Sequence, residues 1–379
     1  MFRTIPSAGA VLSALLFVQV CLGASAAPAR SGNRPAAVGR CLERMQAAGR
    51  VYTNPVWGHD FPDPQMIFFK GLFYVYGTET AAVGPGFQVM SSPDMVHWTR
   101  PRIAFTPPWS TRHLWAPEVV HYRGKFYMTY SALNPETKRH DTGIAVSDTP
   151  LGPFEHRAIL VHADETQGGA IDSTIFFERG GSPYLIYSQE HPRCLVMQPL
   201  ARDLMSVRPE RIVLLHPDRP REHDVTEAPT LIKRNGVYHL FFSTGWFQAR
   251  KGECNYAVCH ASSRQLYGPY VKDREPLITT VPGHVYGPGH QAVITTPAGE
   301  MWLVYHGWDP TGEPRYGGGN SGGRSLRIDR ILWDGDTPRV VGPTTDPQTA
   351  PIVEKRAGMR ANGRSNRAPA EAETAPSYR

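Results

Sequence analysis

The chain has 379 residues, a formal net charge of +6, 41% hydrophobic residues and 10% aromatic residues. Its 40 lysines and arginines are scattered rather than gathered into a stripe, which argues against a nucleic-acid partner. Glycine (36) and proline (35) are both abundant, and this favours many short strands and turns over long helices. We therefore expect an all-β protein.

The first feature in chain order is an apolar segment, residues 8–22, which follows Arg3 and precedes small residues at 24–26. This pattern is typical of a cleavable signal peptide, here residues 1–26. A membrane anchor is the alternative, but the segment is too short to span a bilayer comfortably. We therefore expect a secreted or periplasmic protein that does not associate with a membrane.

The two ends of the remaining chain differ in composition from its middle. Residues 27–48 are rich in Ala, Pro, Arg and Gly, which indicates a linker or disordered arm. Residues 351–379 have almost no large apolar side chains and are expected to form a disordered tail. The folded domain is therefore predicted to occupy residues 49–350.

Four of the five cysteines lie beyond the predicted signal peptide: Cys41, Cys194, Cys254 and Cys259. In an oxidising compartment they can form up to two disulfides, and Cys254–Cys259 is the favoured pair. Their spacing does not match a zinc site.

Five aromatic-rich strands recur along the folded domain at intervals of about fifty to sixty residues, which is the period of a repeat architecture. The predicted strands span residues 72–76, 125–130, 183–187, 237–242 and 301–305. Most follow a glycine-containing turn and a preceding apolar strand, which is a hairpin pattern. A sheet of three or four such strands cannot bury both faces alone, and radial packing of five sheets solves this. We predict a five-bladed β-propeller; a β-sandwich would not explain five regular repeats.

A polar group precedes or begins the first strand of every predicted blade, so these groups are expected to meet around the central channel. They are Asp63, Glu118, Asp172, Glu227 and His290. Any one of them alone reads as a turn or strand-start residue. Four carboxylates and a histidine at equivalent places in five repeats would push one another's pKa values apart. Glycoside hydrolysis needs such a pair, one carboxyl protonated and one ionised.

The motifs around these residues resemble glycoside hydrolase family 43, over roughly residues 53 to 342. The resemblance rests on Asn54-Pro55, Asp63-Pro64, Trp115-Ala116-Pro117-Glu118, Ile171-Asp172, Glu227-Ala228-Pro229 and Gly289-His290. Each motif is short, but their order and their placement in successive blades agree with the family. The family often has glycine where Ala228 stands, a small change that should be tolerated.

The resemblance implies roles for five residues, and a sixth, Trp115, is a candidate because of its aromatic side chain. Asp63 would be the general base of an inverting hydrolysis, Glu227 the general acid, and Asp172 the residue that tunes and orients that acid. His290 would lie near the channel axis, Arg324 would bind substrate, and Trp115 would stack on a sugar ring, although a tryptophan in a repeated strand is more often a core residue.

The expected substrates are arabinofuranosyl or xylosyl linkages of plant cell-wall polysaccharides or their oligosaccharides. No cofactor is expected, a calcium ion in the channel near His290 stays open, and we expect a monomer. Two alternatives remain. One is a propeller that binds carbohydrate without catalysis, and the other is a propeller hydrolase acting on galactose-containing or other glycans.

Overall fold

The structure is a computed structural model that describes residues 50–163, 168–247, 254–309 and 323–353. The chain divides into two compact units, residues 1–52 and 53–379. Strand β1 (Val51–Tyr52) belongs to the first unit, and the account below concerns the second. The predicted signal peptide, the linker arm and the predicted tail from residue 354 onward lie outside the described residues.

The second unit consists of five antiparallel sheets, one for each predicted repeat. The first sheet contains β3 (Gln65–Phe69), β4 (Leu72–Gly77), β5 (Phe87–Ser92) and β6 (Arg102–Phe105), and the second contains β7 (Trp115–Tyr122), β8 (Lys125–Leu133), β9 (His140–Ser147) and β10 (Glu155–Val161). The third sheet contains β11 (Ala170–Phe177), β12 (Pro183–Glu190), β13 (Arg193–Pro199) and β14 (Ile212–Leu215). The fourth contains β15 (Thr226–Arg234), β16 (Val237–Thr244), β17 (Ala257–Ser263) and β18 (Val271–Lys272). The fifth sheet contains β19 (Tyr286–Thr295), β20 (Met301–Trp308), β21 (Arg324–Asp334), β22 (Thr337–Val340) and β2 (Trp57–Asp60). A short strand, β23 (Gln348–Thr349), follows.

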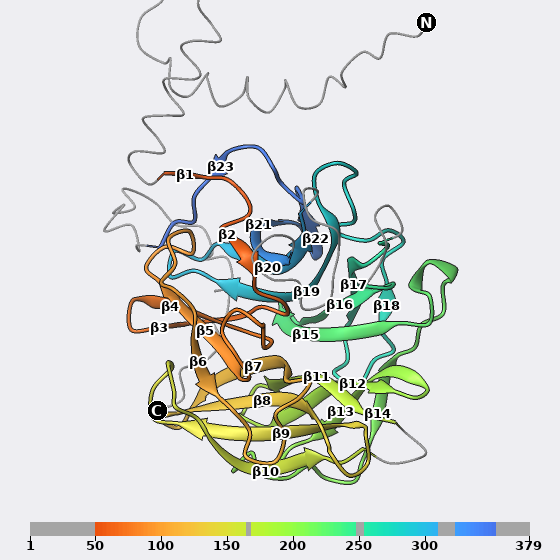
Figure 1. Cartoon of the computed structure of the whole chain (residues 1–379). Helices are drawn as coiled ribbons and strands as arrows, with labels where there is room; N and C mark the ends of the chain where they lie inside the picture. Colours follow the sequence, from red (N-terminus) through yellow and green to blue (C-terminus); the bar gives the residue numbers. More distant parts are fainter. Residues whose placement is uncertain (1–49, 164–167, 248–253, 310–322, 354–379) are drawn as a thin grey trace, which may run out of the picture. The chain divides into compact units, whose positions relative to one another are not determined.

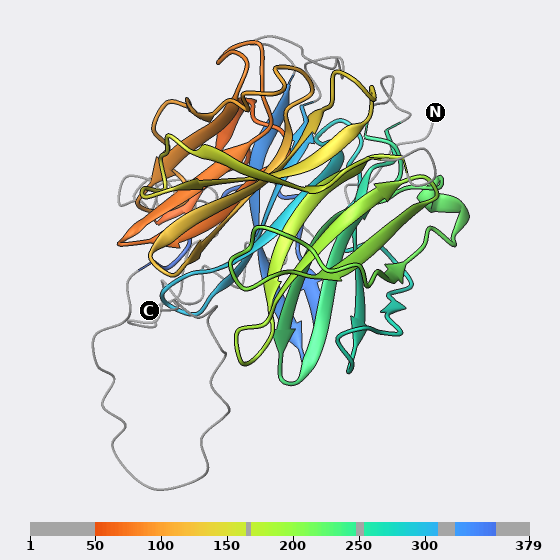
Figure 2. The ribbon, with the colours of Figure 1, turned by 90° about the horizontal axis from the view of Figure 1, so that it is seen from below.

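The five sheets are the blades of a β-propeller, as the repeat predicts. The first strands contact one another in a closed circle, β3 to β7, β11, β15, β19 and back to β3. Figure 1 shows the blades in this order, and the perpendicular view in Figure 2 shows the twist of their sheets. The helical structure in the described residues is a short 3-10 helix, η1 (Pro220–Glu222), and no helix there is long and apolar enough to cross a membrane.

The hydrophobic core lies between neighbouring blades, because each sheet buries a face against the next. Separate clusters of buried side chains join blades one and two, two and three, three and four, and four and five. The aromatic residues of the repeat contribute to these clusters, as Tyr74 does in the first and Tyr238 in the third. The aromatic repeat is therefore the packing surface between blades.

The predicted Cys254–Cys259 disulfide is wrong for this structure. Cys194, Cys254 and Cys259 are buried and unpaired, and Cys41 lies outside the described residues. Cys259 on β17 packs into the core between blades three and four, whereas Cys254 packs with Tyr256 and Trp308. The two thiols therefore belong to different clusters, although they are close in sequence.

The propeller closes through the segment that precedes its first blade. Strand β2 pairs with β21, so the fifth sheet combines strands from both ends of the unit. The buried side chain of Asn54 reinforces this junction. Its Nδ2 donates to the Ile328 carbonyl at 2.8 Å and to Thr344 Oγ1 at 3.0 Å, and its Oδ1 accepts the Ile328 N–H at 3.0 Å.

Asn54→Ala should destabilise the propeller, because it removes the three hydrogen bonds that this buried side chain makes to Ile328 and Thr344. We expect the free energy of unfolding to fall by about 2–3 kcal/mol. Urea denaturation measures this loss, with Thr53→Ala at the exposed neighbouring position as the matched control. Equal stability of the two variants would show that Asn54 does not secure the closure.

Candidate active site

The innermost part of every blade contains the same backbone irregularity. One non-glycine residue at or just before each first strand has left-handed geometry: Asp63 (φ 55°), Ala116 (φ 49°), Asp172 (φ 55°), Ala228 (φ 52°) and His290 (φ 47°). Register shifts at the same places in β7, β11, β15 and β19 mark β-bulges. We call these five the bulge residues. Left-handed geometry in non-glycine residues costs energy and is common at functional sites.

The carboxylates do not all occupy the bulge position, which corrects the equivalence expected from sequence. Asp63 and Asp172 are bulge residues themselves. Glu227 comes one residue before its bulge, and Glu118 comes two residues after its own. Their side chains therefore leave the strands at different heights along the channel.

Asp63, the predicted base, is buried and bonded through both carboxylate oxygens. Arg324 Nη1 donates to Oδ1 at 2.8 Å, and Thr78 Oγ1 donates to Oδ2. Burial acts to raise the pKa of Asp63, but the charge of the Arg324 guanidinium holds it well below its usual range. Asp63 is therefore an ionised proton acceptor.

Arg324 is itself positioned by Asp60. Asp60 Oδ1 accepts the backbone N–H of Arg324 at 2.8 Å, and Asp60 pairs with Ser325 across β2 and β21. The predicted substrate-binding arginine thus contacts the predicted base directly. It begins β21, whereas Arg327 on the same strand bonds to Asp309 instead.

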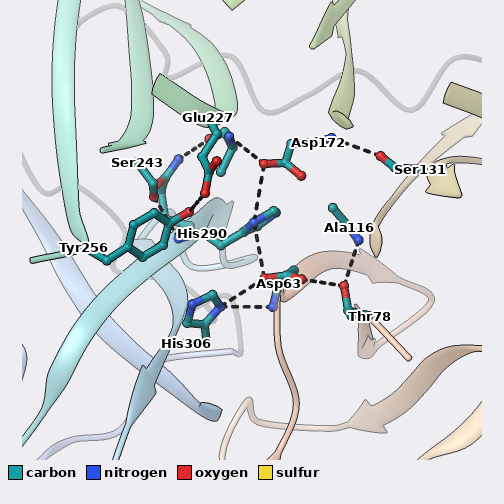
Figure 3. A network of polar contacts seen from close by, with 12 residues as sticks. Asp63, Thr78, Ala116, Ser131, Asp172, Glu227, Ser243, Tyr256, His290 and His306 are labelled. Atoms are coloured by element: carbon teal, nitrogen blue, oxygen red, sulfur yellow. Dashed lines mark hydrogen bonds and ion pairs between the residues drawn. The ribbon is translucent and has the colours of Figure 1, made fainter. Parts of the chain in front are cut away.

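Two histidines lie beside Asp63. His306 Nδ1 accepts the backbone N–H of Asp63 at 3.1 Å, so its proton is on Nε2. Burial lowers the pKa of His306 to about 3, and burial also lowers the pKa of His290. Both imidazoles are therefore neutral. His290 Nδ1 lies 3.4 Å from Asp63 Oδ1 and 3.8 Å from Asp172 Oδ2, between the two acids (Figure 3).

The surroundings of His290 do not support the calcium ion that the sequence left open. Its two carboxylate neighbours are already bonded to other groups, Asp63 to Arg324 and Asp172 to the Ala228 N–H. Within residues 50–353, apart from the three undescribed gaps, no three His, Cys, Asp or Glu side chains are grouped as metal ligands. We therefore assign no calcium ligands here.

Asp172, which is buried, and Glu227, which is partly buried, form a second pair of acids, shown in the upper part of Figure 3. Burial and the charges of Glu227 and Asp63 raise the pKa of Asp172 well above its usual range. Burial likewise raises the pKa of Glu227, although Tyr256 and Arg193 act against this shift. Because two buried carboxylates in one site repel each other, the pair retains a proton at a pH where isolated acids have lost theirs.

Glu227 is held by two residues that sequence reasoning missed. The Tyr256 hydroxyl donates to Oε1 at 2.7 Å, and Arg193 Nη1 lies 3.6 Å from Oε2. Gly289 allows the tyrosine to approach, because a Cβ at this position would overlap the Tyr256 ring. Arg193 also lines an open cavity of about 410 Å³ with Glu190, His191, Pro192, His216, Pro217 and Asp224. Arg193 therefore links this cavity to Glu227.

Trp115, the predicted sugar platform, begins β7 and is half-buried. Its ring stacks with His140 at a centroid distance of 4.1 Å and with His113 at 5.0 Å. His140 Nδ1 in turn lies 3.5 Å from Glu190, which lines the cavity next to Glu227. Stacking of Trp115 on a sugar stays a prediction.

A propeller whose channel holds one carboxyl with a lowered pKa beside carboxyls with raised pKa values has the chemistry of a glycosidase. Comparison with known proteins identifies the family. The sequence profile of Glycosyl hydrolases family 43 matches residues 52–338. The chain belongs to this family and is a glycoside hydrolase.

Individual relatives agree with this assignment. The chain is 27% identical over 271 residues to a β-D-galactofuranosidase of Aspergillus niger, covering 67% of this chain and 75% of the relative. It is 24% identical over 321 residues to an extracellular endo-α-(1→5)-L-arabinanase of Bacillus subtilis, covering 77% and 94%. The crystal structure of a thermostable family-43 glycoside hydrolase superposes with a TM-score of 0.70 at 30% identity, covering 80% of this chain and all of that one.

Glu118 is a further buried acid, and it yields a prediction for stability. It lies on β7 opposite Thr129, and burial raises its pKa to about 8 although Thr174 donates a hydrogen bond to it. The folded protein therefore keeps this proton over a range of pH in which the unfolded chain releases it.

Glu118→Gln should accordingly stabilise the protein more at alkaline than at acidic pH. The stability tied to the raised pKa of Glu118 is fully present below the unfolded value and is lost as pH rises towards about 8. The difference between variant and wild type should grow by at most about 1.4 kcal/mol per pH unit over this range and then level off. Chemical denaturation at a series of pH values measures it. A difference independent of pH would contradict the protonated state of Glu118.

Proposed function

We propose that this enzyme hydrolyses arabinofuranosyl or xylosyl linkages of plant polysaccharides or their oligosaccharides, with inversion at the anomeric carbon. The observation that carries the proposal is the division of charge in the channel. Asp63 is held ionised by Arg324, whereas Glu227 is pushed towards its protonated form. Glycoside hydrolysis requires a protonated and an ionised carboxyl of this kind, and inversion follows the expectation from the family resemblance.

In this mechanism Asp63 accepts a proton from a water molecule as the water oxygen attacks the anomeric carbon. The bond between that carbon and the leaving oxygen breaks, and Glu227 gives its proton to the leaving oxygen. Tyr256 occupies Oε1 of Glu227, so the transferable proton is assigned to Oε2. Arg193, which lies beside Oε2, is placed to stabilise the carboxylate left after transfer.

The relatives suggest the sugar. The Bacillus subtilis relative is named for arabinan, which supports an α-L-arabinofuranosyl substrate. The Aspergillus niger relative is named for galactofuranose, so a galactofuranoside is the second candidate. Both names describe five-membered sugar rings. We also propose that the enzyme acts outside the cytoplasm, which agrees with the predicted signal peptide and with the extracellular relative.

Substitution of the two proposed catalytic acids should separate their roles. With aryl arabinofuranoside, xyloside and galactofuranoside, arabinan and arabinoxylan as substrates, Asp63→Ala should lower kcat about 10³-fold or more on all that the wild type cleaves. Glu227→Ala should lower kcat to a similar extent when the leaving group is a sugar. On dinitrophenyl glycosides kcat should fall far less, because dinitrophenolate leaves with little protonation. Each general acid or base contributes about 10²–10⁴-fold.

The exposed Glu136→Ala serves as the control for loss of a carboxylate. Proton NMR of the first product identifies the anomer and hence inversion or retention. Wild-type hydrolysis that survives both active-site substitutions would refute the assignment, and binding of the sugars without hydrolysis would favour the carbohydrate-binding alternative.

Tyr256→Phe tests the hydrogen bond to the proposed acid. The tyrosine hydroxyl stabilises ionised Glu227 and so acts to lower the pKa of Glu227. Without it, this pKa should rise, and the alkaline limb of the kcat/KM profile should move to higher pH. An unchanged limb, measured on the best substrate of the panel, would mean that Tyr256 does not act through Glu227.

A further inference from the structure

The backbone N–H groups of the bulge residues are hydrogen-bonded in a pattern that repeats around the propeller. In each blade the residue before the bulge pairs across the hairpin with a polar residue of the second strand or just beyond it. These partners are Thr78, Ser131, Ser188, Ser243 and His306. We call them the cap residues.

Each cap residue faces the bulge of the following blade. Four of them accept the N–H of that bulge residue: Thr78 from Ala116 at 2.8 Å, Ser131 from Asp172 at 3.1 Å, Ser243 from His290 at 2.8 Å, and His306 from Asp63 at 3.1 Å. By this rule Ser188 should accept the N–H of Ala228.

Ser188 does not follow the rule. The Ala228 N–H is donated instead to Asp172 Oδ2, at 3.1 Å. The Ser188 side chain is buried, with 2% of its surface exposed, and its Oγ has no hydrogen-bond partner among the described residues. An unpaired buried hydroxyl is unfavourable and calls for an explanation. This exception falls beside the proposed acid, because Ala228 directly follows Glu227.

Blade one shows the arrangement that blade three lacks. There Thr78 Oγ1 accepts the Ala116 N–H and at the same time donates its own proton to Asp63 Oδ2. Asp63 and Asp172 occupy the same bulge position, and Thr78 and Ser188 the same cap position. The corresponding bonds in blade three would run from Ala228 N–H to Ser188 and from Ser188 to Asp172.

We propose that Ser188 is the alternative acceptor of the Ala228 N–H and lets Asp172 turn from this N–H towards a sugar bound beside Glu227. The inference rests on the proposed function, since it gives Asp172 a ligand to turn to. If the Asp172 carboxylate turned away and no other group accepted the Ala228 N–H, this buried N–H would have no hydrogen-bond partner next to Glu227. With Ser188 as acceptor the N–H stays bonded, Asp172 keeps a hydrogen bond from the serine hydroxyl, and Glu227 keeps its place. Ser188 is therefore a positioning residue.

A double-mutant cycle on stability tests the shared N–H without any substrate. Ser188→Ala is measured in three backgrounds: wild type, Asp172→Asn and Asp172→Ala. In the wild-type background Ser188→Ala removes no hydrogen bond that the structure shows. In the Asp172→Asn background the amide oxygen of residue 172 still accepts the Ala228 N–H. In both backgrounds Ser188→Ala should therefore change stability little. In Asp172→Ala the serine is the remaining acceptor. Its loss should lower the folding equilibrium constant about tenfold or more.

Ser131→Ala is the matched control, because it removes a cap bond that is present and should destabilise the otherwise wild-type protein. Ser188→Ala effects that are equal in all three backgrounds would overturn the shared N–H. A loss of stability in wild type equal to that of Ser131→Ala would overturn it too, since Ser188 would then be an ordinary cap.

Kinetics test the role in turnover. Ser188→Ala should lower kcat about tenfold with little change in KM, and Ser188→Thr, which copies the cap of blade one, should restore it. Wild-type kinetics in Ser188→Ala would overturn the positioning role. A wild-type protein that cleaves none of the glycosides would refute the proposed function instead, and the stability cycle would still decide whether Ser188 and Asp172 share the N–H.

Discussion

The propeller depends on pairing one buried backbone N–H at each bulge around its axis. A bulge turns this N–H out of its own sheet, and an unpaired N–H in a buried position would cost as much as a lost hydrogen bond. The acceptors come from the preceding blade, and His306 of blade five caps Asp63 of blade one. The same bonds therefore join neighbouring blades and place the side chains that line the channel.

Asp63 and Asp172 show that blade position alone does not decide a residue's chemistry. Both are bulge residues with φ 55°, yet the pKa of Asp63 is lowered and that of Asp172 is raised. Both are buried, so burial acts in the same direction on each. The difference comes from their neighbours across the channel. Asp63 has the Arg324 guanidinium from blade five, whereas Asp172 has the Glu227 carboxyl from blade four. A symmetric backbone thus carries an asymmetric field, and acid–base chemistry needs that asymmetry.

The parts of the site that could be predicted from sequence are those on the first strands. Asp63, Asp172, Glu227 and His290 stand in short motifs at a regular place in each repeat, because every first strand reaches the axis. Arg193 begins β13 and Tyr256 directly precedes β17, the third strands of their blades, where no repeated polar pattern marks them. The cap residues do have a sequence pattern. In four of the five aromatic-rich strands a polar residue directly follows the last aromatic residue, as in Tyr130-Ser131, Tyr187-Ser188, Phe242-Ser243 and Tyr305-His306. The cysteine spacing misled because two thiols five residues apart can pack into different clusters.

In the proposed mechanism the stereochemical outcome depends on the separation between the base and the acid, which the arrangement of the blades sets. The base stands on blade one and the acid on blade four, and the two blades are not adjacent in the circle of first strands. Their separation is therefore set by how blade five packs between them on one side and blades two and three on the other. An inverting enzyme needs a gap of roughly 6.5–9.5 Å for a water between its carboxyls. In the proposed mechanism Asp172, on blade three, is placed to orient the sugar within that gap.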